Sequence, residues 1–122
     1  MMIVLIEDDD ATRDSLRLLL ECEGLPVCEF ASCNDFLAAE GSADPRCLIL
    51  DIHMTGMTGI ELLQRLRARG TMVPAIFMTG NPNSAVKSRA ATAGALAVFE
   101  KPFEASELVD MVRAVLGERP PR

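Results

Sequence analysis

The sequence has few of the residues on which many cofactor and metal sites depend. It contains no tryptophan, no tyrosine and one histidine, and aromatic residues make up only 4% of the chain. A flavodoxin that stacks such rings on a flavin is therefore disfavoured. The four cysteines show no C-x-x-C spacing and are expected in or near the core, without a zinc site or a disulfide framework. They are Cys22, Cys28, Cys33 and Cys47.

Basic side chains and long apolar runs are also scarce. Twelve Lys and Arg face 18 Asp and Glu, which gives a net charge of −6. This balance argues against direct binding to a nucleic-acid backbone or to an anionic membrane surface. No apolar run approaches the roughly 20 residues of a membrane span. No basic segment precedes the apolar N-terminal stretch, so we expect a cytoplasmic protein without a secretory signal.

Five short apolar runs alternate with five helical patterns along the chain. The expected strands are residues 2–6, 27–30, 47–51, 75–78 and 96–100. The expected helices are about 11–23, 32–40, 59–69, 85–93 and a last one that Gly117 closes. This (βα)5 alternation predicts one α/β domain over residues 1–117 with a doubly wound parallel sheet. Residues 118–122 are expected to be a frayed tail or the start of a linker.

Polar side chains follow the ends of four of these runs. Glu7 and Asp8 follow the first run, and Asp51 ends the third. Thr79 and Lys101 follow the fourth and fifth runs. Parallel strands bring these ends to one edge of the sheet, where acids need a cation such as Mg²⁺. A carboxylate beside a lysine and a threonine suits phosphoryl transfer, with Asp51 as nucleophile because it ends the middle strand.

Each of these residues also has an ordinary structural explanation. The acids of residues 7–10 could only cap the following helix. Asp51 and Thr79 could be turn residues, and Lys101 could be a solvated lysine. Their joint occurrence at strand ends favours the interpretation as a site.

Five motifs, in order and spacing, resemble the receiver domain of two-component response regulators. They are Glu7-Asp8, Asp51, Met54-x-Gly56-Met57-x-Gly59, Thr79-Gly80 and Glu100-Lys101-Pro102-Phe103. The resemblance extends from Ile3 to about Leu116 and is greatest to receivers attached to helix-turn-helix transcriptional regulators. It implies a flavodoxin-like sheet with strand order 2-1-3-4-5.

The resemblance implies a phospho-acceptor and a metal site. Asp51 would accept a phosphoryl group from a histidine kinase or a histidine phosphotransfer protein. Asp8 and Asp51 would bind Mg²⁺ directly, Glu7 would bind it through water, and the backbone carbonyl of His53 would be a further ligand. Phosphoryl transfer to Asp51 and hydrolysis from it would be the only chemistry, so the chain would not be a conventional enzyme.

The resemblance also implies roles for the residues around the phosphoryl group. Thr79 would hydrogen-bond the group and move with it. Lys101 would form an ion pair with the group and precede a cis bond to Pro102. The residues at His53 and Asn81 would tune the lifetime of the phosphorylated form.

The implied partners bind at two surfaces. A kinase would dock on the first helix near Arg13, Leu16 and Leu20 and on the Pro102-Phe103 loop. A homodimer would form through the fourth helix, the fifth strand and the fifth helix. The chain could be a complete single-domain regulator or a receiver cut from a longer transcription factor or hybrid kinase.

Two positions depart from the pattern of receivers. Thr55 stands where proline is usual, so we expect a looser loop there. Val98 stands where an aromatic switch residue is usual. Phe99 is next along the chain, but the alternation of side chains along a strand predicts that it lies on the opposite face. A rotating aromatic ring is therefore not expected as the readout.

A second family shares part of one motif. Residues 51–55 partly resemble the Asp-x-Asp-x-Thr motif of haloacid-dehalogenase-type phosphatases, which also form an aspartyl-phosphate. His53 stands where their second aspartate acts as general acid and base, and the chain has no room for a cap domain. An enzyme of this kind is the weaker alternative.

Overall fold

Ten elements alternate along the chain in the computed structural model, which describes residues 2–39, 45–81 and 83–117. The strands are β1 (Met2–Ile6), β2 (Val27–Phe30), β3 (Pro45–Asp51), β4 (Ala75–Thr79) and β5 (Ala97–Glu100). The helices are α1 (Asp10–Cys22), α2 (Cys33–Ala38), α3 (Gly59–Ala68), α4 (Ser84–Thr92) and α5 (Ala105–Val115). The (βα)5 alternation is confirmed. The predicted tail at 118–122 and the predicted end of the second helix at Glu40 lie outside the described residues.

All five strands are parallel and pair in the order β2-β1-β3-β4-β5. The predicted sheet and strand order are therefore confirmed. β3 is the central strand, and its Leu48, Ile49 and Leu50 have no exposed surface. Burial on both faces explains why this segment reads as a continuous apolar run. The carboxyl end of β3, which carries Asp51, thus lies at the middle of the sheet edge.

The start of β3 differs from the sequence-based expectation. The sequence pattern predicts a strand that begins at Cys47, but β3 begins at Pro45, opposite Met2 of β1. A proline at the first position of a strand need not donate a ladder hydrogen bond, so its ring does not interrupt the pairing. The prediction that this strand begins only at Cys47 was therefore wrong.

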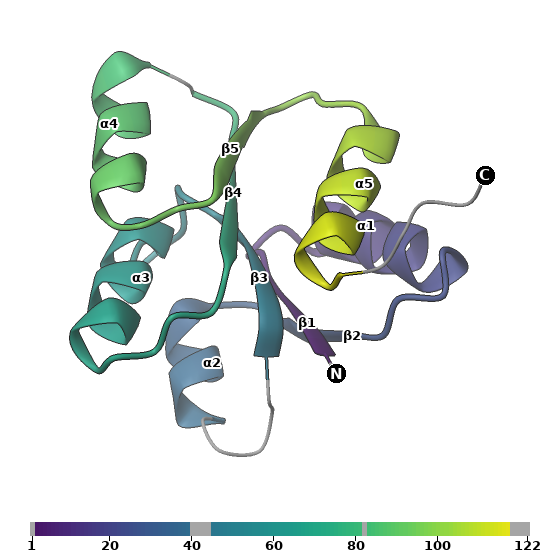
Figure 1. The fold of residues 1–122 in the computed structure, drawn as a ribbon, viewed down its shortest axis with the longest axis horizontal. Helices are drawn as coiled ribbons and strands as arrows, with labels where there is room; N and C mark the ends of the chain where they lie inside the picture. Colours follow the sequence, from purple (N-terminus) through teal and green to yellow (C-terminus); the bar gives the residue numbers. More distant parts are fainter. Residues whose placement is uncertain (1, 40–44, 82, 118–122) are drawn as a thin grey trace.

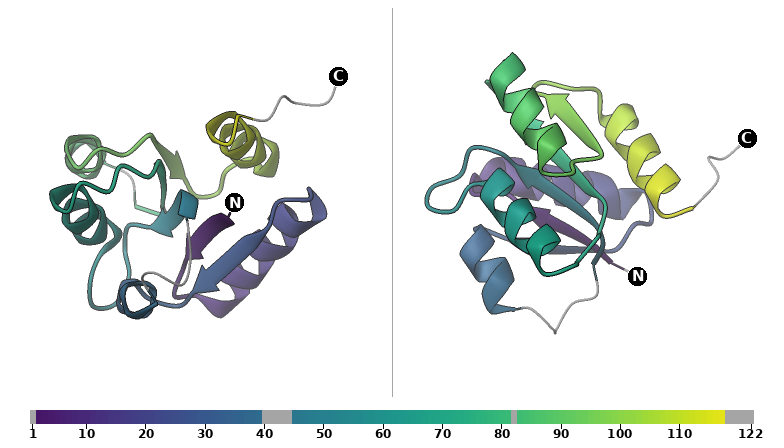
Figure 2. Two further views of the ribbon diagram at one scale, coloured as in Figure 1. Left: turned by 60° about the horizontal axis from the view of Figure 1, so that its bottom comes forward. Right: turned by 60° about the vertical axis from the view of Figure 1, so that its left-hand side comes forward.

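Helices cover both faces of the sheet. α1 and α5 lie on one side, and α2, α3 and α4 lie on the other (Figure 1, Figure 2). Alternate strand residues face the two layers: Val4 and Ile6 pack in the core toward α3, whereas Ile3 and Leu5 pack in the core toward α1. The two cores fix the strand ends, which leaves the carboxyl edge of the sheet for polar residues.

The acids after β1 divide into two groups. Asp9 is the N-cap of α1 and accepts hydrogen bonds from the Thr12 amide and hydroxyl, at 2.8 and 2.7 Å. The Thr12 hydroxyl lowers the pKa of Asp9. Asp10 pairs with Arg13 on the same helix. A helix cap and an ion pair within α1 therefore account for Asp9 and Asp10, and Glu7 and Asp8 remain at the sheet edge.

The cysteines are free thiols at different depths. Cys33 and Cys47 are buried, as expected, and burial raises the pKa of each thiol to about 12. Cys22 is exposed, so the expectation that it lies in or near the core was wrong. It is the last residue of α1, beyond the buried stripe of Leu16 and Leu20.

Candidate phosphoryl-acceptor site

Three predicted site residues meet at the carboxyl edge of the sheet. The Lys101 Nζ atom, just after β5, lies 2.5 Å from Asp51 Oδ2 and 3.0 Å from Glu7 Oε1. Glu7 is 1% exposed and Asp51 is 7% exposed. The strand order explains the meeting, because β1 and β4 flank β3 and β5 follows β4. One ammonium thus serves two buried carboxylates.

Burial dominates the electrostatics of Glu7. Desolvation raises its pKa to about 7; the hydrogen bond from Lys101 opposes this shift, and the negative charge of Asp51 adds to it. Burial would also lower the pKa of Lys101, but its hydrogen bonds to Asp51 and Glu7 outweigh burial and raise it. The lysine is therefore charged at neutral pH, whereas Glu7 titrates near neutrality.

The second carboxylate oxygen of Glu7 has no hydrogen-bond partner among the described residues. Glu7 Oε2 is buried and has no hydrogen-bond partner. A buried, unsatisfied carboxylate oxygen costs free energy unless a donor or a cation joins it. Glu7 also neighbours Asp8, whose exposed side chain lies at the same turn. The oxygen-only chemistry of this pair fits Mg²⁺ or a bound water.

The side chains alone do not enclose a cation. Among residues 2–39, 45–81 and 83–117, no three His, Cys, Asp or Glu side chains form a group that could hold one. Mg²⁺ usually keeps several waters and takes one or two carboxylates. Asp8 and Asp51 each supply one carboxylate at this edge of the sheet, which matches that donor chemistry. The residues present therefore fit the ion.

Both oxygens of Asp51 are engaged. The backbone N–H of His53 donates to Asp51 Oδ1 at 2.8 Å, while Oδ2 faces Lys101. The ring of His53 belongs to an exposed residue at the rim of the site. The carboxylate is thus held in one orientation by one main-chain donor and one ammonium.

Thr55, which stands where receivers usually have proline, forms a hydrogen bond with the acidic turn. The Thr55 N–H lies 3.4 Å from Asp8 Oδ2 and donates to it. Proline has no N–H, so it could not make this bond. We expected Thr55 only to loosen the loop, and this contact was not foreseen.

Thr79 ends β4 and is fully buried. Its hydroxyl accepts a hydrogen bond from the Asn81 N–H at 3.1 Å, and its carbonyl accepts one from the Lys101 N–H at 2.8 Å. The Lys101–Pro102 bond is cis, as the family resemblance implied. The ends of β4 and β5 are therefore joined directly beside the acidic residues.

Gly59 was noted in the sequence only as part of a loop motif. A Cβ atom built on it would lie 2.5 Å from the backbone oxygen of Asp51 and 3.1 Å from Phe77 Cε1. Its N–H donates to the Ile52 carbonyl at 3.2 Å. The first residue of α3 therefore lies against the backbone of the acceptor aspartate, at a distance that only glycine permits.

Val98 and Phe99 lie on opposite faces of β5, as predicted. Val98 packs against the core toward α3 and α4, and Phe99 packs against the core toward α1 and α5. The Phe99 ring lies 5.5 Å from that of Phe103. The face beside α4 thus has a valine where the family usually has an aromatic ring.

Sequence comparison identifies the family to which this fold and site belong. The response regulator receiver domain family matches residues 3–113. The chain is a member of this family, which confirms the resemblance inferred from the five motifs. Receiver domains of this family act in phosphorylation-dependent signal transduction, interact with kinases and generally bind Mg²⁺ at an acidic pocket. They are not conventional enzymes, and nothing supports the haloacid-dehalogenase alternative.

The relatives are regulators of transcription. The chain is 42% identical over 112 residues to the transcriptional regulatory protein FixJ of Azorhizobium caulinodans, covering 92% of this chain and 53% of that protein. It is 36% identical over 115 residues to the C4-dicarboxylate transport transcriptional regulatory protein DctR of Rhodobacter capsulatus, covering 93% and 58%. The chain thus spans little more than half the length of these relatives.

Solved structures share the fold over nearly the whole chain. The crystal structure of FixJ-N superposes with a TM-score of 0.87 at 27% identity, covering 99% of this chain and 97% of that one. A response regulator receiver protein from Burkholderia phymatum superposes with a TM-score of 0.84 at 36% identity, covering 99% and 98%. The flavodoxin-like receiver fold is therefore established for this chain.

Proposed function

We propose that this chain is a phosphorylation-dependent signalling receiver with Asp51 as its phospho-acceptor. The observation that carries the proposal is the Lys101 ammonium between the carboxylates of Asp51 and Glu7, at 2.5 and 3.0 Å. Asp51 Oδ2 would attack the phosphorus of a phosphohistidine, and the bond from phosphorus to the histidine nitrogen would break. The product is an aspartyl-phosphate, whose new charge Lys101 is placed to neutralise.

We propose a ligand set for Mg²⁺ at the same edge. Asp8 and Asp51 would bind the ion directly, the His53 carbonyl would be a third ligand, and Glu7 would act through a water. The ion would neutralise charge on the phosphoryl oxygens. The unpartnered Oε2 of Glu7 supports this role, because a metal-bound water would satisfy it.

We propose that Thr79 hydrogen-bonds the phosphoryl oxygens. In this structure its hydroxyl accepts from Asn81, and a hydroxyl can donate its own proton at the same time. Thr79 lies next to Met78, which pairs with Asp51 across the sheet. The hydroxyl is therefore one register position from the acceptor strand end, which suits a contact with the new group.

The direct test is intact mass after incubation with Mg²⁺ and acetyl phosphate. We expect the wild type to gain one phosphoryl group and Asp51→Asn to gain none, because the amide is not a nucleophile. EDTA should abolish the gain. Circular dichroism of the variant should match that of the wild type, so that loss of labelling reports chemistry. Equal labelling of both proteins would place the acceptor elsewhere.

The exposed ring of His53 should influence only the lifetime of the product. We expect His53→Ala to reach the same labelled fraction as the wild type but to lose the group at a different rate, because the backbone N–H that holds Asp51 remains. The measurement is decay of the phosphorylated mass after removal of acetyl phosphate. Complete loss of labelling in this variant would contradict the prediction.

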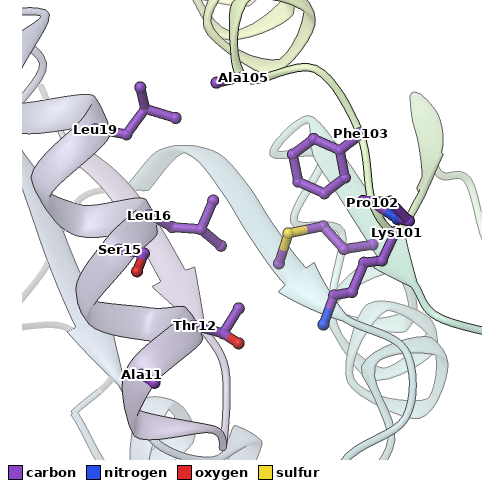
Figure 3. A pocket seen from close by; sticks show the side chains of 10 residues that line it. Ala11, Thr12, Ser15, Leu16, Leu19, Lys101, Pro102, Phe103 and Ala105 are labelled. Atoms are coloured by element: carbon purple, nitrogen blue, oxygen red, sulfur yellow. The ribbon is translucent and has the colours of Figure 1, made fainter.

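We propose that the kinase docks in a groove between α1 and the loop after β5. The groove has a volume of about 570 Å³, and its walls include Leu16, Leu19, Pro102 and Phe103 (Figure 3). Lys101 lies at the same groove, which would bring a donor histidine toward Asp51. The expectation that Leu20 takes part was wrong, because Leu20 has no exposed surface.

We propose a homodimer through α4, β5 and α5. β5 is an edge strand, and Ala90 is the one buried residue of α4.

We further propose that residues 1–117 form the receiver unit and that it works in the cytoplasm. We also propose that it does not bind nucleic acid directly, since the net charge of the chain is −6. Within the described residues, no helix has the length and apolar character to cross a membrane.

A further inference from the structure

One partly buried arginine contacts the backbone of the acidic turn. Arg13 of α1 donates from Nη1 to the main-chain carbonyl of Glu7 at 2.8 Å. Its second terminal nitrogen bonds Asp10 at 2.5 Å, and its Nε lies 3.9 Å from Glu29 on β2. The side chain is only 14% exposed. Arg13 thus joins α1, β2 and the turn between β1 and α1 through partly buried contacts.

The hydrogen bond from Arg13 to the Glu7 carbonyl affects the orientation of the acidic residues, which a surface ion pair would not do. The carbonyl that accepts from Arg13 belongs to the peptide that links Glu7 to Asp8. The orientation of that peptide sets the direction from which both carboxylates leave the backbone. The guanidinium is planar and rigid, so it fixes an acceptor more closely than a flexible ammonium does.

We infer that Arg13 is a positioning residue that holds the Glu7–Asp8 peptide in the orientation needed for cation binding. This inference rests on the proposed function of the acidic edge. Arg13 itself touches neither the ion nor the phosphoryl group. Removing a group that hydrogen-bonds a metal-binding residue, without touching the metal, typically weakens metal binding by about 10–100-fold.

Arg17 provides a matched control. It also lies on α1, about one turn further along, and its Nε is 3.3 Å from Glu29. Its other contacts are with Glu21 and Asp14 of the same helix. Arg13→Ala and Arg17→Ala therefore remove the same charge from the same helix and the same β2 partner. Among the described contacts, Arg13 bonds the Glu7 carbonyl and Arg17 does not.

The experiment is titration of each purified protein with MgCl₂ by isothermal calorimetry, without any phosphodonor. We expect Arg13→Ala to bind Mg²⁺ about tenfold more weakly than Arg17→Ala. Arg13→Gln, which loses the charge but keeps a donor, should recover part of the affinity. Urea unfolding of the same proteins shows whether each is folded under the conditions of the titration.

Three results are distinguishable. Weaker binding in Arg13→Ala with partial recovery in Arg13→Gln supports the inference. Equal dissociation constants for Arg13→Ala and Arg17→Ala, with the wild type binding normally, overturn the inference and leave the proposed function intact. A wild type that binds no Mg²⁺ overturns the proposed metal site and the inference with it.

Discussion

Gly59→Ala is expected to destabilise the protein by about 2–4 kcal/mol. The new methyl group would lie 2.5 Å from the Asp51 carbonyl oxygen, a distance that real Cβ atoms do not adopt. The obstacle is the backbone of the central strand, which cannot rotate away as a flexible side chain can. The start of α3 must therefore move outward, and its hydrogen bond to the Ile52 carbonyl must lengthen.

Gly80→Ala is the matched control for this change. Gly80 follows β4, the strand next to β3, and a Cβ atom there would have nothing within 4 Å. Alanine in place of an unhindered glycine restricts the unfolded chain, so this variant should be unchanged or up to about 1 kcal/mol more stable. Urea unfolding of the two variants gives the comparison. Equal stability of both would mean that α3 yields freely at its first turn.

The sequence sufficed for the framework because its local patterns agree with the tertiary structure. Each strand is an apolar run, each of α1 to α4 begins at a polar cap, and the parallel pairing follows from the alternation of strands and helices. The positions of Asp51 and Lys101 at strand ends then implied their meeting. Pro45 misled the prediction, because a proline read as a loop is also compatible with the first position of a strand.

The contacts that Arg13 and Gly59 make beside the acidic residues could not be predicted from the sequence. The bond from Arg13 to the Glu7 carbonyl spans six residues around a turn, and its acceptor is a main-chain group that has no letter in the sequence. The approach of Gly59 to Asp51 depends on how closely α3 packs against β3. Only the fixed place of the glycine in its loop hinted at it. Contacts that involve main-chain atoms need the coordinates.

Lys101→Met is expected to make stability depend more strongly on pH than it does in the wild type. The substitution removes the ammonium from two carboxylates that are 1% and 7% exposed. Breaking a buried pair by removing one partner leaves uncompensated charge, which we expect to cost about 2–3 kcal/mol at pH 8. The pKa of Glu7, already about 7 beside the lysine, must rise further because the two opposing effects of Lys101 are lost.

The direction in which stability changes with pH follows from the linkage between proton binding and folding. A carboxyl group whose folded pKa exceeds its unfolded value, about 4.5 for Glu7, lowers stability as pH rises from 4.5 through the folded pKa. The free energies of unfolding of the wild type and Lys101→Met should therefore differ least near pH 4.5, where Glu7 is protonated in both proteins, and most at pH 8. Urea unfolding in EDTA at several pH values measures the difference.

Lys87→Met separates the buried pair from an exposed one of equal length. Lys87 Nζ lies 2.5 Å from Glu100 Oε1, but both side chains are 51% exposed. This pair should be worth less than about 1 kcal/mol, with little change across the same pH range. A parallel loss in both lysine variants would mean that burial does not govern the acidic edge.

Mg²⁺ should reverse the defect of Lys101→Met. With the ammonium gone, the same carboxylates attract a divalent cation without competition from a positive charge, so the variant should bind Mg²⁺ more tightly than the wild type. An ion that binds only the folded state adds stability, and the added stability grows with the logarithm of the ion concentration. The free energy of unfolding should rise between EDTA and about 10 mM MgCl₂ in both proteins. The rise should be larger in Lys101→Met than in the wild type. A smaller rise would show that Lys101 helps to build the cation site instead of competing with it.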